Sequence, residues 1–517
     1  MGLAMTTAVR SADLPCDTVA LFARLSAGVD DAVLLESLDG NGLNNRQSLL
    51  FVRSALRIEG RGRRVLITPL TAGGRRAIDP LLGELGRVAE VVRIDETLVA
   101  SFPPPVRGGT DAERIAARTT ADALRTVLEC GREGAALLRL AGVFAYDFVE
   151  QLEDLPPARE DRHRFPDFVF WVPERLAVVD HTVDRVELIA HAFGDDVADA
   201  AQAEKQADEM LRSLGPRHSV RSCVPAAVAP DEQVAVDLDD RMFAELVEEL
   251  RAHVVAGDVF QIVPSRTFSA SCPDPAAAYA ELRALNPSPY MFFVKWGELV
   301  LLGASPETCV RVSGEPRRVE VRPIAGTRPR GRGEDGELDE DADRRLEAEL
   351  RLNEKEVAEH MMLVDLARND VARISRAGTR RVARLLQVER YSHVMHLVSA
   401  VEGELREGLD ALHAYLASAN MGTLVGAPKI EAARLLRRYE ADRRGPYGGA
   451  VGYLCSDGTM DTAIVIRSAL VRDGRAHVRA GAGVVFDSDP EAEARETRAK
   501  AQAVLRAVQL AGQRGAR

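Results

Sequence analysis

Residues 449–480 read GAVGYLCSDGTMDTAIVIRSALVRDGRAHVRA, a stretch with clear hairpin signals. Two Asp-Gly pairs, at Asp457 and Asp473, each separate runs of apolar residues that are long enough to form a strand. Asp-Gly between two such runs is the strongest short-range signal for a β-hairpin. The expected strands are Gly449–Cys455, Met460–Val471 and Ala476–Ala480. The stretch therefore predicts three consecutive antiparallel strands.

Helices and further strands are expected on both sides of these hairpins. Asp489 is a good N-cap and Pro490 suits the first helical position, which predicts a last helix to about Leu510. Other helices are expected at Asp111–Cys130 and, from its apolar spacing, at Asp240–Ala256. The other expected strands are Ala32–Glu36, Ser48–Ile58 and Arg64–Thr68. Because the elements follow no regular βαβ rhythm, we expect an α+β fold with helices on the outer faces of antiparallel sheets.

The chain has 517 residues, which is enough for two domains or one large composite domain. Its best candidate linker is Leu214–Asp239, a polar stretch with three prolines and little periodicity. We therefore expect an N-terminal domain over residues 1–230 and a second domain over residues 235–512.

Composition and charge restrict the class of protein. Hydrophobic residues make up 46% and charged residues 28%, as in a soluble globular protein. The net charge of −12 argues against a general nucleic-acid binder, and it means that an anionic substrate needs local positive groups or a metal. No apolar run is long enough for a membrane span, and the first residues do not resemble a secretory signal. Six scattered cysteines without a CxxC pair are typical of reduced thiols in a cytoplasmic protein.

Two pairs of carboxylates could hold a hard cation. Glu356 and Glu359 lie three residues apart in one expected helix, and Glu493 and Glu496 lie three apart in another. Each pair therefore shares one helix face, and Lys500 follows on the face of the second pair. Mg²⁺ accepts a few carboxylates and completes its shell with water or substrate oxygens. Spacing alone leaves a solvated acidic helix surface as the other interpretation.

Two glycine-containing stretches lie beside expected strands. AGAGVVF (480–486) places Gly481 and Gly483 before the last helix, where backbone N–H groups could meet an anion. PIAGTRPRGR (323–332) carries Gly326 and Thr327 ahead of three arginines. Taken alone, a β-bulge and a basic loop explain these stretches better than a binding site. Neither stretch matches a nucleotide-binding fingerprint.

Arg467 and His396 each allow two interpretations. Arg467 lies in the expected strand Met460–Val471, on the same face as Val465 and Ala469. An arginine among apolar neighbours needs a partner, which is either an internal carboxylate or the carboxylate of a substrate. A histidine in an apolar stretch, such as His396, is usually a core residue whose hydrogen bonds are satisfied.

Taken together, these motifs resemble the chorismate-utilising enzymes, and within that family the large subunits of anthranilate synthase. The resemblance covers nearly the whole chain. It rests on LLES (34–37), FQIVPSR (260–266), NPSPYMFF (286–293), GASPE (303–307), PIAGTRPRGR, EHMMLVDLARND (359–370), NMGTLVGAPK (420–429), PYGGAVGY (446–453), IVIRSAL (464–470) and GAGVVFDSDPEAEARETRAKA (481–501). It implies an α+β chorismate-binding fold with a cleft between the helices and two antiparallel sheets, in which residues 235–512 form the catalytic domain.

The resemblance also implies roles for individual residues. The implied Mg²⁺ ligands are Glu359 and Glu496, with Glu356 and Glu493 beside them. The implied substrate-binding residues are Gly326, Thr327, Tyr447, Arg467, Gly481, Ala482, Gly483 and Lys500, and the implied catalytic positions are Glu307, His396, Thr423 and Gln261. Glu307 would be the general acid that helps the 4-hydroxyl of chorismate leave, because hydroxide is a poor leaving group and a buried carboxyl keeps its proton.

Two positions separate this chain from related activities. Isochorismate and salicylate synthases resemble one another in carrying a water-activating lysine where this chain has Gln261, which cannot act as a base. Aminodeoxychorismate synthases generally carry PIKGT, whose lysine attacks the ring, whereas this chain has Ala325. Both differences favour a lyase that aminates chorismate directly with ammonia, giving anthranilate and pyruvate, the first committed step of tryptophan biosynthesis.

The resemblance implies one protein partner and one regulator. No GxCxG nucleophile turn occurs in the sequence, so a separate glutamine amidotransferase subunit would deliver the ammonia. The family's feedback site for L-tryptophan would consist of Glu36 and Ser37 of the N-terminal domain with Pro289, Tyr290 and Met291. Two alternatives stay open: a 2-amino-2-deoxyisochorismate synthase, which stops before pyruvate loss, and a non-catalytic tryptophan-binding regulator.

Overall fold

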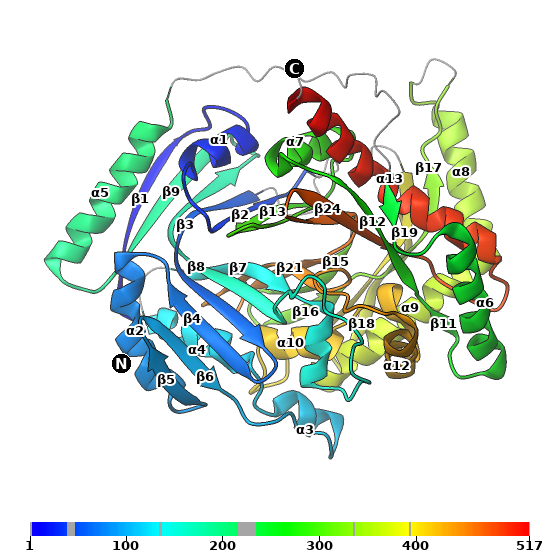
Figure 1. Ribbon diagram of the computed structural model, residues 1–517, viewed down its shortest axis with the longest axis horizontal. Helices are drawn as coiled ribbons and strands as arrows, with labels where there is room; N and C mark the ends of the chain where they lie inside the picture. The colour runs from blue at the N-terminus through cyan, green and yellow to red at the C-terminus, as the bar shows by residue number, and fades with distance from the viewer. Residues whose placement is uncertain are drawn as a thin grey trace.

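Two antiparallel layers of strands face each other across the centre of the molecule, and helices cover their outer sides (Figure 1). The computed structural model describes residues 3–38, 47–133, 137–215, 234–333, 337–391 and 394–515. The α+β arrangement expected from the sequence is therefore confirmed. Most of the expected linker lies outside the described residues.

The first layer, the upper one in Figure 1, runs without interruption through strands from both ends of the chain. In spatial order its strands are β1 (Met5–Asp13), β9 (Arg185–Phe193), β8 (Phe168–Asp180), β3 (Gln47–Arg61), β2 (Ala32–Glu36), β13 (Tyr290–Trp296), β14 (Leu299–Ser305), β23 (Ser468–Arg472), β24 (Arg475–Gly481), β12 (Ser265–Ser271) and β10 (Ala235–Val236). The β2–β13 pairing joins the two expected domains in one sheet.

The second layer is attached to the first through the pairing of β7 with β8. Its strands in spatial order are β7 (Arg139–Phe144), β21 (Ala450–Cys455), β22 (Met460–Ile464), β15 (Thr308–Ser313), β16 (Arg318–Val321) and β19 (Val394–Glu404), which also pairs with β17 (Ile324–Pro329) and β18 (Arg381–Arg390). Shorter strands complete the sheets: β4 (Arg64–Pro69), β6 (Thr97–Ser101) and β5 (Glu90–Ile94) beside β3, and the separate pair β11 (Gln261–Ile262) and β20 (Gly426–Ala427).

Helices pack on the outer face of each layer. Helices α7 (Pro275–Leu285) and α13 (Pro490–Gly515) contact the first layer, and α9 (Glu354–Ile374) and α10 (Ala411–Ser418) contact the second. The remaining helices are α1 (Thr18–Leu25), α2 (Ala72–Leu85), α3 (Asp111–Ala116), α4 (Asp122–Cys130), α5 (Val197–Ser213), α6 (Asp240–Ala256), α8 (Glu340–Leu352), α11 (Gly422–Val425) and α12 (Lys429–Tyr439). Every described helix is too short or too polar to cross a membrane.

Three apolar clusters follow from this layering. One lies between the sheets and contains Trp171 and Leu301 from the first layer with Val451 and Ala463 from the second. A second lies between the first layer and α7 and α13, and a third between the second layer and α9 and α10. Central strands such as β3, β8 and β14 therefore bury both of their faces, which explains the long apolar runs in the sequence.

Both expected ends of α6 are confirmed, and α13 begins at the expected Pro490 but continues beyond the expected end near Leu510 to Gly515. Asp239 accepts a hydrogen bond from the Met242 N–H at the start of α6, and Asp489 accepts one from the Ala492 N–H at the start of α13. Both carboxylates occupy the N-cap position, where an acceptor satisfies an otherwise unpaired backbone donor. The expected helix Asp111–Cys130 is wrong in one respect, because the chain forms two helices, α3 and α4, with a break between them.

The expected strand Met460–Val471 is also wrong, because it divides into β22 and β23. β22 belongs to the second layer and β23 to the first, so the three intervening residues carry the chain from one layer to the other. Arg467 adopts a left-handed conformation there, with φ of 50°. The alternation that placed Arg467 on the face of Val465 and Ala469 therefore does not hold.

Candidate active site

A cavity of about 640 Å³ lies between helices α9 and α13 and the ends of strands from both layers. It brings together nearly all of the residues that the sequence singled out, although they come from positions far apart in the chain. Those that line it are Gln261, Glu307, Gly326, Thr327, Glu356, Glu359, His396, Thr423, Tyr447, Arg467, Gly481, Gly483, Glu493, Glu496 and Lys500. Ala482 does not line it, because its N–H donates to the Pro264 carbonyl and the residue is fully buried.

The cavity forms where the chain passes between the layers. Arg467 occupies the crossing from β22 to β23, and Glu307 occupies the crossing from β14 to β15. The Ile464 N–H donates to the Glu307 carbonyl over 3.0 Å, which ties the two crossings together. Backbone that leaves one sheet for another turns its side chains out of the sheet faces, so both residues can reach the cavity.

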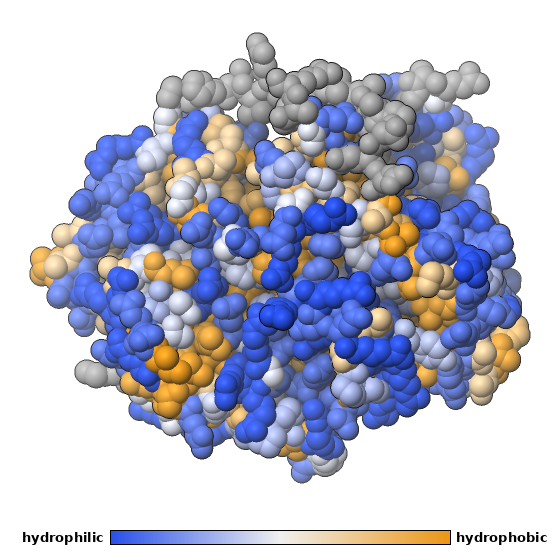
Figure 2. All heavy atoms as spheres, viewed as in Figure 1, coloured by the Kyte–Doolittle hydropathy of each residue, from blue (hydrophilic) through white to orange (hydrophobic). Residues whose placement is uncertain are grey.

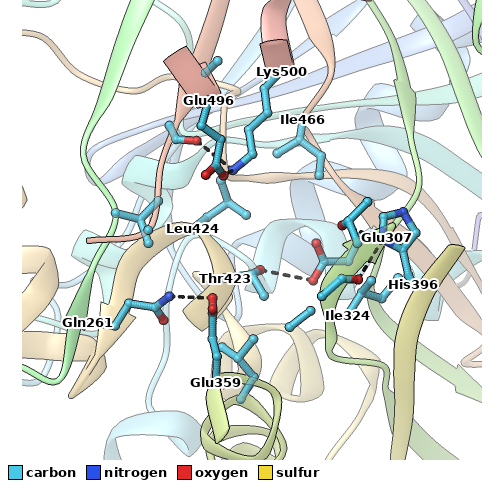
Figure 3. A pocket seen from close by; sticks show the side chains of 18 of the residues that line it. Gln261, Glu307, Ile324, Glu359, His396, Thr423, Leu424, Ile466, Glu496 and Lys500 are labelled. Atoms are coloured by element: carbon cyan, nitrogen blue, oxygen red, sulfur yellow. Dashed lines mark hydrogen bonds and ion pairs between the residues drawn. The ribbon is translucent and has the colours of Figure 1, made fainter. Parts of the chain in front are cut away.

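Glu307 is an acid that is held protonated at neutral pH. Its side chain is only 5% exposed, and this burial raises the pKa of Glu307 to about 8. The Thr423 hydroxyl donates to Glu307 Oε1 over 3.1 Å, and Lys500 also lowers the pKa, but neither offsets the burial (Figure 3). A carboxyl group in this state can donate a proton to a leaving group.

Two carboxylates face one another across the cavity. Glu359 points into it from α9 and Glu496 points into it from α13 (Figure 3). Burial raises the pKa of Glu359, and the nearby Glu356 and Glu496 carboxylates raise it further. Gln261 Nε2 donates to Glu359 Oε1 over 3.1 Å, and Lys500 Nζ lies 2.5 Å from Glu496 Oε1. Carboxylates that destabilise one another in this way are stabilised by a cation placed between them.

The other two predicted metal ligands differ in their surroundings. Glu356 is engaged by Arg328, whose Nη1 donates to Glu356 Oε1 over 2.9 Å. Glu493 Oε2 is buried without a hydrogen-bond partner among the described residues. Within the described ranges, no group of three or more His, Cys, Asp and Glu side chains is arranged to hold a metal ion. The facing Glu359 and Glu496 carboxylates and the unpaired Glu493 oxygen fit an ion that takes a few carboxylates and completes its shell with substrate oxygens and water, as Mg²⁺ does.

The glycines before α13 leave room for a ligand and for neighbouring groups. A β-carbon on Gly481 would lie 2.7 Å from the Pro264 carbonyl oxygen and 3.0 Å from the Tyr447 hydroxyl. A β-carbon on Gly483 would lie 2.9 Å from Gln261 Nε2. Any larger residue at either position would therefore displace a side chain of the cavity wall or the backbone behind it.

The stretch around Gly326 is a β-bulge that contributes to the cavity. The register of β17 on β19 shifts between Ala325 and Thr327, and Gly326 has a φ of 78°. His396 Nδ1 lies 2.9 Å from Thr327 Oγ1 and 3.3 Å from the Gly326 carbonyl oxygen. Burial lowers the pKa of His396 to about 4, so the imidazole is neutral. The stretch around Gly326 is therefore a β-bulge and also part of the cavity wall.

Arg467 has no internal ion pair among the described residues. Its Nη1 donates to the Lys500 carbonyl over 3.1 Å, and burial lowers its pKa. The buried Tyr447 ring lies near two other guanidinium groups, 5.8 Å from Arg444 and 6.0 Å from Arg479. A guanidinium that lines a cavity and forms no ion pair among the described residues is suited to bind an anionic group from outside.

Two basic residues of the cavity wall were missed from the sequence. Arg479 lies two residues before Gly481 on β24 and therefore on the same face, which was the available signal. Lys355 precedes Glu356 on α9, and nothing in its spacing distinguished it from surface lysines. Both add positive charge to a cavity in a chain whose net charge is −12.

A second, much smaller cavity of about 40 Å³ lies where β2 meets β13. All five residues expected in a feedback site line it: Glu36, Ser37, Pro289, Tyr290 and Met291. The Glu36 carboxylate does not turn toward a ligand, because it accepts from the Tyr279 hydroxyl over 2.6 Å and pairs with Arg283 Nε at 3.2 Å. In this conformation the cavity has room for only a few water molecules.

Comparison with known proteins agrees with this geometry. The model of the chorismate binding enzyme family matches residues 88–506. The chain belongs to this family. Its sequence is 50% identical over 483 residues to anthranilate synthase component 1, pyocyanine specific, of Pseudomonas aeruginosa, covering 93% of this chain and 90% of that protein. It is 48% identical over 500 residues to anthranilate synthase component 1 of Vibrio cholerae, covering 96% of this chain and 95% of that protein.

Solved structures of the family share the fold. Anthranilate synthase component I from Streptococcus pneumoniae superposes with a TM-score of 0.65 at 29% identity, covering 90% of this chain and 93% of that one. The menaquinone-specific isochorismate synthase from Escherichia coli superposes with a TM-score of 0.69 at 18% identity, covering 98% and 96%. At 18% identity, the comparison with the isochorismate synthase shows similarity of fold alone. The chorismate-utilising fold expected from the sequence motifs is confirmed.

Proposed function

We propose that this chain is the aminating subunit, component I, of an anthranilate synthase, which converts chorismate and ammonia to anthranilate, pyruvate and water. The observation that carries the proposal is the protonated Glu307 in a cavity that contains Gln261 and Ala325 in place of lysines. The acid can assist loss of a hydroxyl group, while the absence of a lysine at either position disfavours attack by water or by the protein. The names of the similar proteins support the same reaction.

Binding of chorismate, a dianion, depends on positive groups at two places. Arg467 and the Tyr447 hydroxyl suit the enolpyruvyl carboxylate, because Arg467 forms no ion pair with a carboxylate of the described residues. Glu359 and Glu496 would hold Mg²⁺ with Glu493 and Glu356 beside them, and the ion would neutralise the ring carboxylate. The Gly481 and Gly483 backbone and Lys500 lie beside this place in the cavity wall.

The chemistry requires one proton donor and an unprotonated nucleophile. Ammonia forms a bond to ring carbon 2 while the bond from carbon 4 to its hydroxyl breaks, and Glu307 donates the proton that turns the hydroxyl into water. The carbon-2 proton is then lost as the enolpyruvyl group leaves as pyruvate, which gives the aromatic ring. His396 is neutral and can accept a proton, and Thr423 orients Glu307 through its hydrogen bond.

The experiment is a reconstitution with omissions. Purified chain, chorismate, ammonium and Mg²⁺ should yield anthranilate, identified by its mass and fluorescence, and pyruvate in equal amount. Omission of Mg²⁺ or ammonium should stop the reaction. Isochorismate, salicylate or 2-amino-2-deoxyisochorismate as the main product would refute the proposal.

Three finer assignments belong to the same proposal. A glutamine amidotransferase subunit supplies ammonia in the cytoplasm, L-tryptophan inhibits through the cavity at Ser37 and Met291, and the chain divides into residues 1–230 and 235–512. The assignment of a tryptophan site is supported by five expected residues lining one cavity. For tryptophan to enter, this small cavity must open, so binding must select a different conformation.

A further inference from the structure

A buried ion network lies beside Tyr447 in the wall of the active-site cavity. At its centre is Glu440, which follows α12 and is 8% exposed. Glu440 accepts two hydrogen bonds from Arg444, from Nη2 over 2.7 Å and from Nε over 2.8 Å, and one from Arg479 Nη2 over 2.9 Å. The Ser265 N–H and hydroxyl donate to the same carboxylate, over 3.0 and 2.7 Å. Burial alone would raise the pKa of Glu440, but the two guanidinium groups lower it to about 2, so the carboxylate is ionised.

This network keeps one positive charge beside Tyr447. Its two guanidinium groups share one carboxylate, and they lie 5.8 and 6.0 Å from the centre of the Tyr447 ring. The Asp442 carboxylate also interacts with one of them, but Arg162 Nε lies 3.9 Å from Asp442 Oδ2 and offsets its charge. Burial lowers the pKa of His163 and His477 nearby, so both imidazoles are neutral. Hydrophilic residues cover most of the face shown in Figure 2, whereas this charge lies inside the protein, where it is screened less.

Arg479 lines the cavity, but the protein engages all three of its guanidinium nitrogens. Nη2 donates to the carboxylate of the network, Nε donates to the Ser265 hydroxyl over 2.8 Å, and Nη1 donates to the Arg443 carbonyl over 3.1 Å. Arg467 differs, because it donates to one backbone carbonyl and forms no ion pair among the described residues. Arg467 is therefore suited to contact a substrate, whereas Arg479 is suited to act through its neighbour Tyr447.

We propose that Arg479 is a positioning residue for chorismate, which holds the Tyr447 phenol in place and strengthens the hydrogen bond from its hydroxyl to the enolpyruvyl carboxylate. The proposal rests on the function proposed above, and it specifies how that cavity recognises its substrate. A positive charge near a phenol stabilises negative charge on the oxygen, so the O–H group becomes a stronger donor. Burial raises the pKa of Tyr447, and Arg444 and Arg479 each offset this rise more than Arg467 does. The network therefore acts on Tyr447 more strongly than the arginine that is free to bind the substrate.

The first variant removes the charge of Arg479. In Arg479→Gln a neutral amide replaces the guanidinium, and Glu440 keeps both hydrogen bonds from Arg444, so no buried charge is left without a partner. The control is Arg475→Gln, the same substitution at an exposed position of the same strand, β24. At saturating ammonium and Mg²⁺, we expect the KM for chorismate to rise about tenfold in Arg479→Gln, because a hydrogen bond to a charged group is weakened. The kcat should stay within threefold of wild type, since ground state and transition state lose the same contact, and the control should match the wild-type chain.

A double-mutant cycle tests whether Arg479 acts through Tyr447. Tyr447→Phe removes the hydroxyl, so adding Arg479→Gln in that background should raise the KM by no more than about twofold. Arg479→Lys keeps the positive charge, and its KM should stay within threefold of wild type. Calorimetry with chorismate should show the same order of affinities. The midpoint of denaturant unfolding of each variant separates a loss of affinity from a loss of the fold.

Three results would overturn the proposal. The KM could be unchanged in Arg479→Gln, it could rise as far in Arg479→Lys as in Arg479→Gln, or the full tenfold rise could persist in the Tyr447→Phe background. The last result would mean that Arg479 contacts chorismate on its own. If the wild-type chain makes no anthranilate from ammonium, the proposed function fails instead, and the calorimetric affinities still test the role of Arg479.

Discussion

At the scale of single residues, the cavity changes the chemistry of ordinary carboxyl groups. Glu307 would be ionised in water at neutral pH, but burial at the crossing from β14 to β15 keeps its proton. Burial and the acidic neighbours of Glu359 raise its pKa. The first glutamate is therefore suited to donate a proton, while the second is suited to bind a cation that stabilises its charged form.

The role of Glu307 predicts a pH dependence. Because its pKa is about 8, the protonated form that can donate is lost above that pH, and kcat/KM for chorismate should fall there. Glu307→Gln keeps the shape but carries no transferable proton, so kcat should fall by about 10²–10⁴. Steady-state rates between pH 6 and 10 measure both effects. A variant that retains turnover and the same alkaline limb would show that another group is the acid.

The two facing carboxylates predict a metal requirement. Glu359→Gln and Glu496→Gln each remove an anionic ligand, so the Mg²⁺ concentration for half-maximal activity should rise roughly tenfold or more. Glu354→Gln and Glu491→Gln are matched controls on the same helices, because both side chains are exposed outside the cavity. Titrations of activity with Mg²⁺ at saturating chorismate give the comparison. If the controls and the cavity variants behave alike, the ligand assignment is wrong.

At the scale of elements, the strand ends fix the shape of the cavity. β24 ends at Gly481, where a side chain would meet the Pro264 carbonyl and the Tyr447 hydroxyl. Gly481→Ala should therefore destabilise the fold by about 1–3 kcal/mol and raise the KM for chorismate. Gly512→Ala on α13 is the control, since nothing lies within 4 Å of its added carbon. Denaturant unfolding and chorismate titration measure the two effects, and equal behaviour of the two variants would contradict this close approach.

The sequence predicted the elements better than their connections. The Asp-Gly hairpins, the α13 cap and most residues of the cavity were expected, because turn chemistry and motif order are local features. The break within Met460–Val471 was not, because an unbroken apolar run gives no sign that the chain changes layer. Arg467 reaches the cavity through that break and not through strand alternation. Lys355 was missed because one lysine on a charged helix resembles any other.

At the scale of the whole molecule, the two cavities are joined through a short path. Tyr290, which lines the smaller cavity, lies with its hydroxyl 2.9 Å from the Thr308 hydroxyl, and Thr308 follows Glu307 in the chain. A ligand that moves Tyr290 can therefore change the position of Glu307. This path gives a physical basis for inhibition at a distance. A ligand in the smaller cavity and a ligand in the larger one would favour different positions of the same packed residues.

This path predicts reciprocal coupling between tryptophan and chorismate. Each ligand should weaken the binding of the other by the same factor, corresponding to about 1–3 kcal/mol. Ser37→Phe should fill the smaller cavity and abolish tryptophan binding, while ammonium-dependent activity stays near wild type. Calorimetry of tryptophan with and without chorismate measures the coupling. Tryptophan binding that survives Ser37→Phe unchanged would place the regulatory site elsewhere.

The proposed function requires that this chain aminate chorismate with free ammonia. The most direct measurement supplies the isolated wild-type chain with chorismate, Mg²⁺, ¹⁵N-ammonium and unlabelled glutamine, and records the mass of the product. We expect anthranilate that carries ¹⁵N in every molecule, because Gln261 and Ala325 leave ammonia as the nucleophile and the sequence has no GxCxG glutaminase nucleophile. Anthranilate with unlabelled nitrogen, or a hydroxylated ring in place of an aminated one, would contradict it.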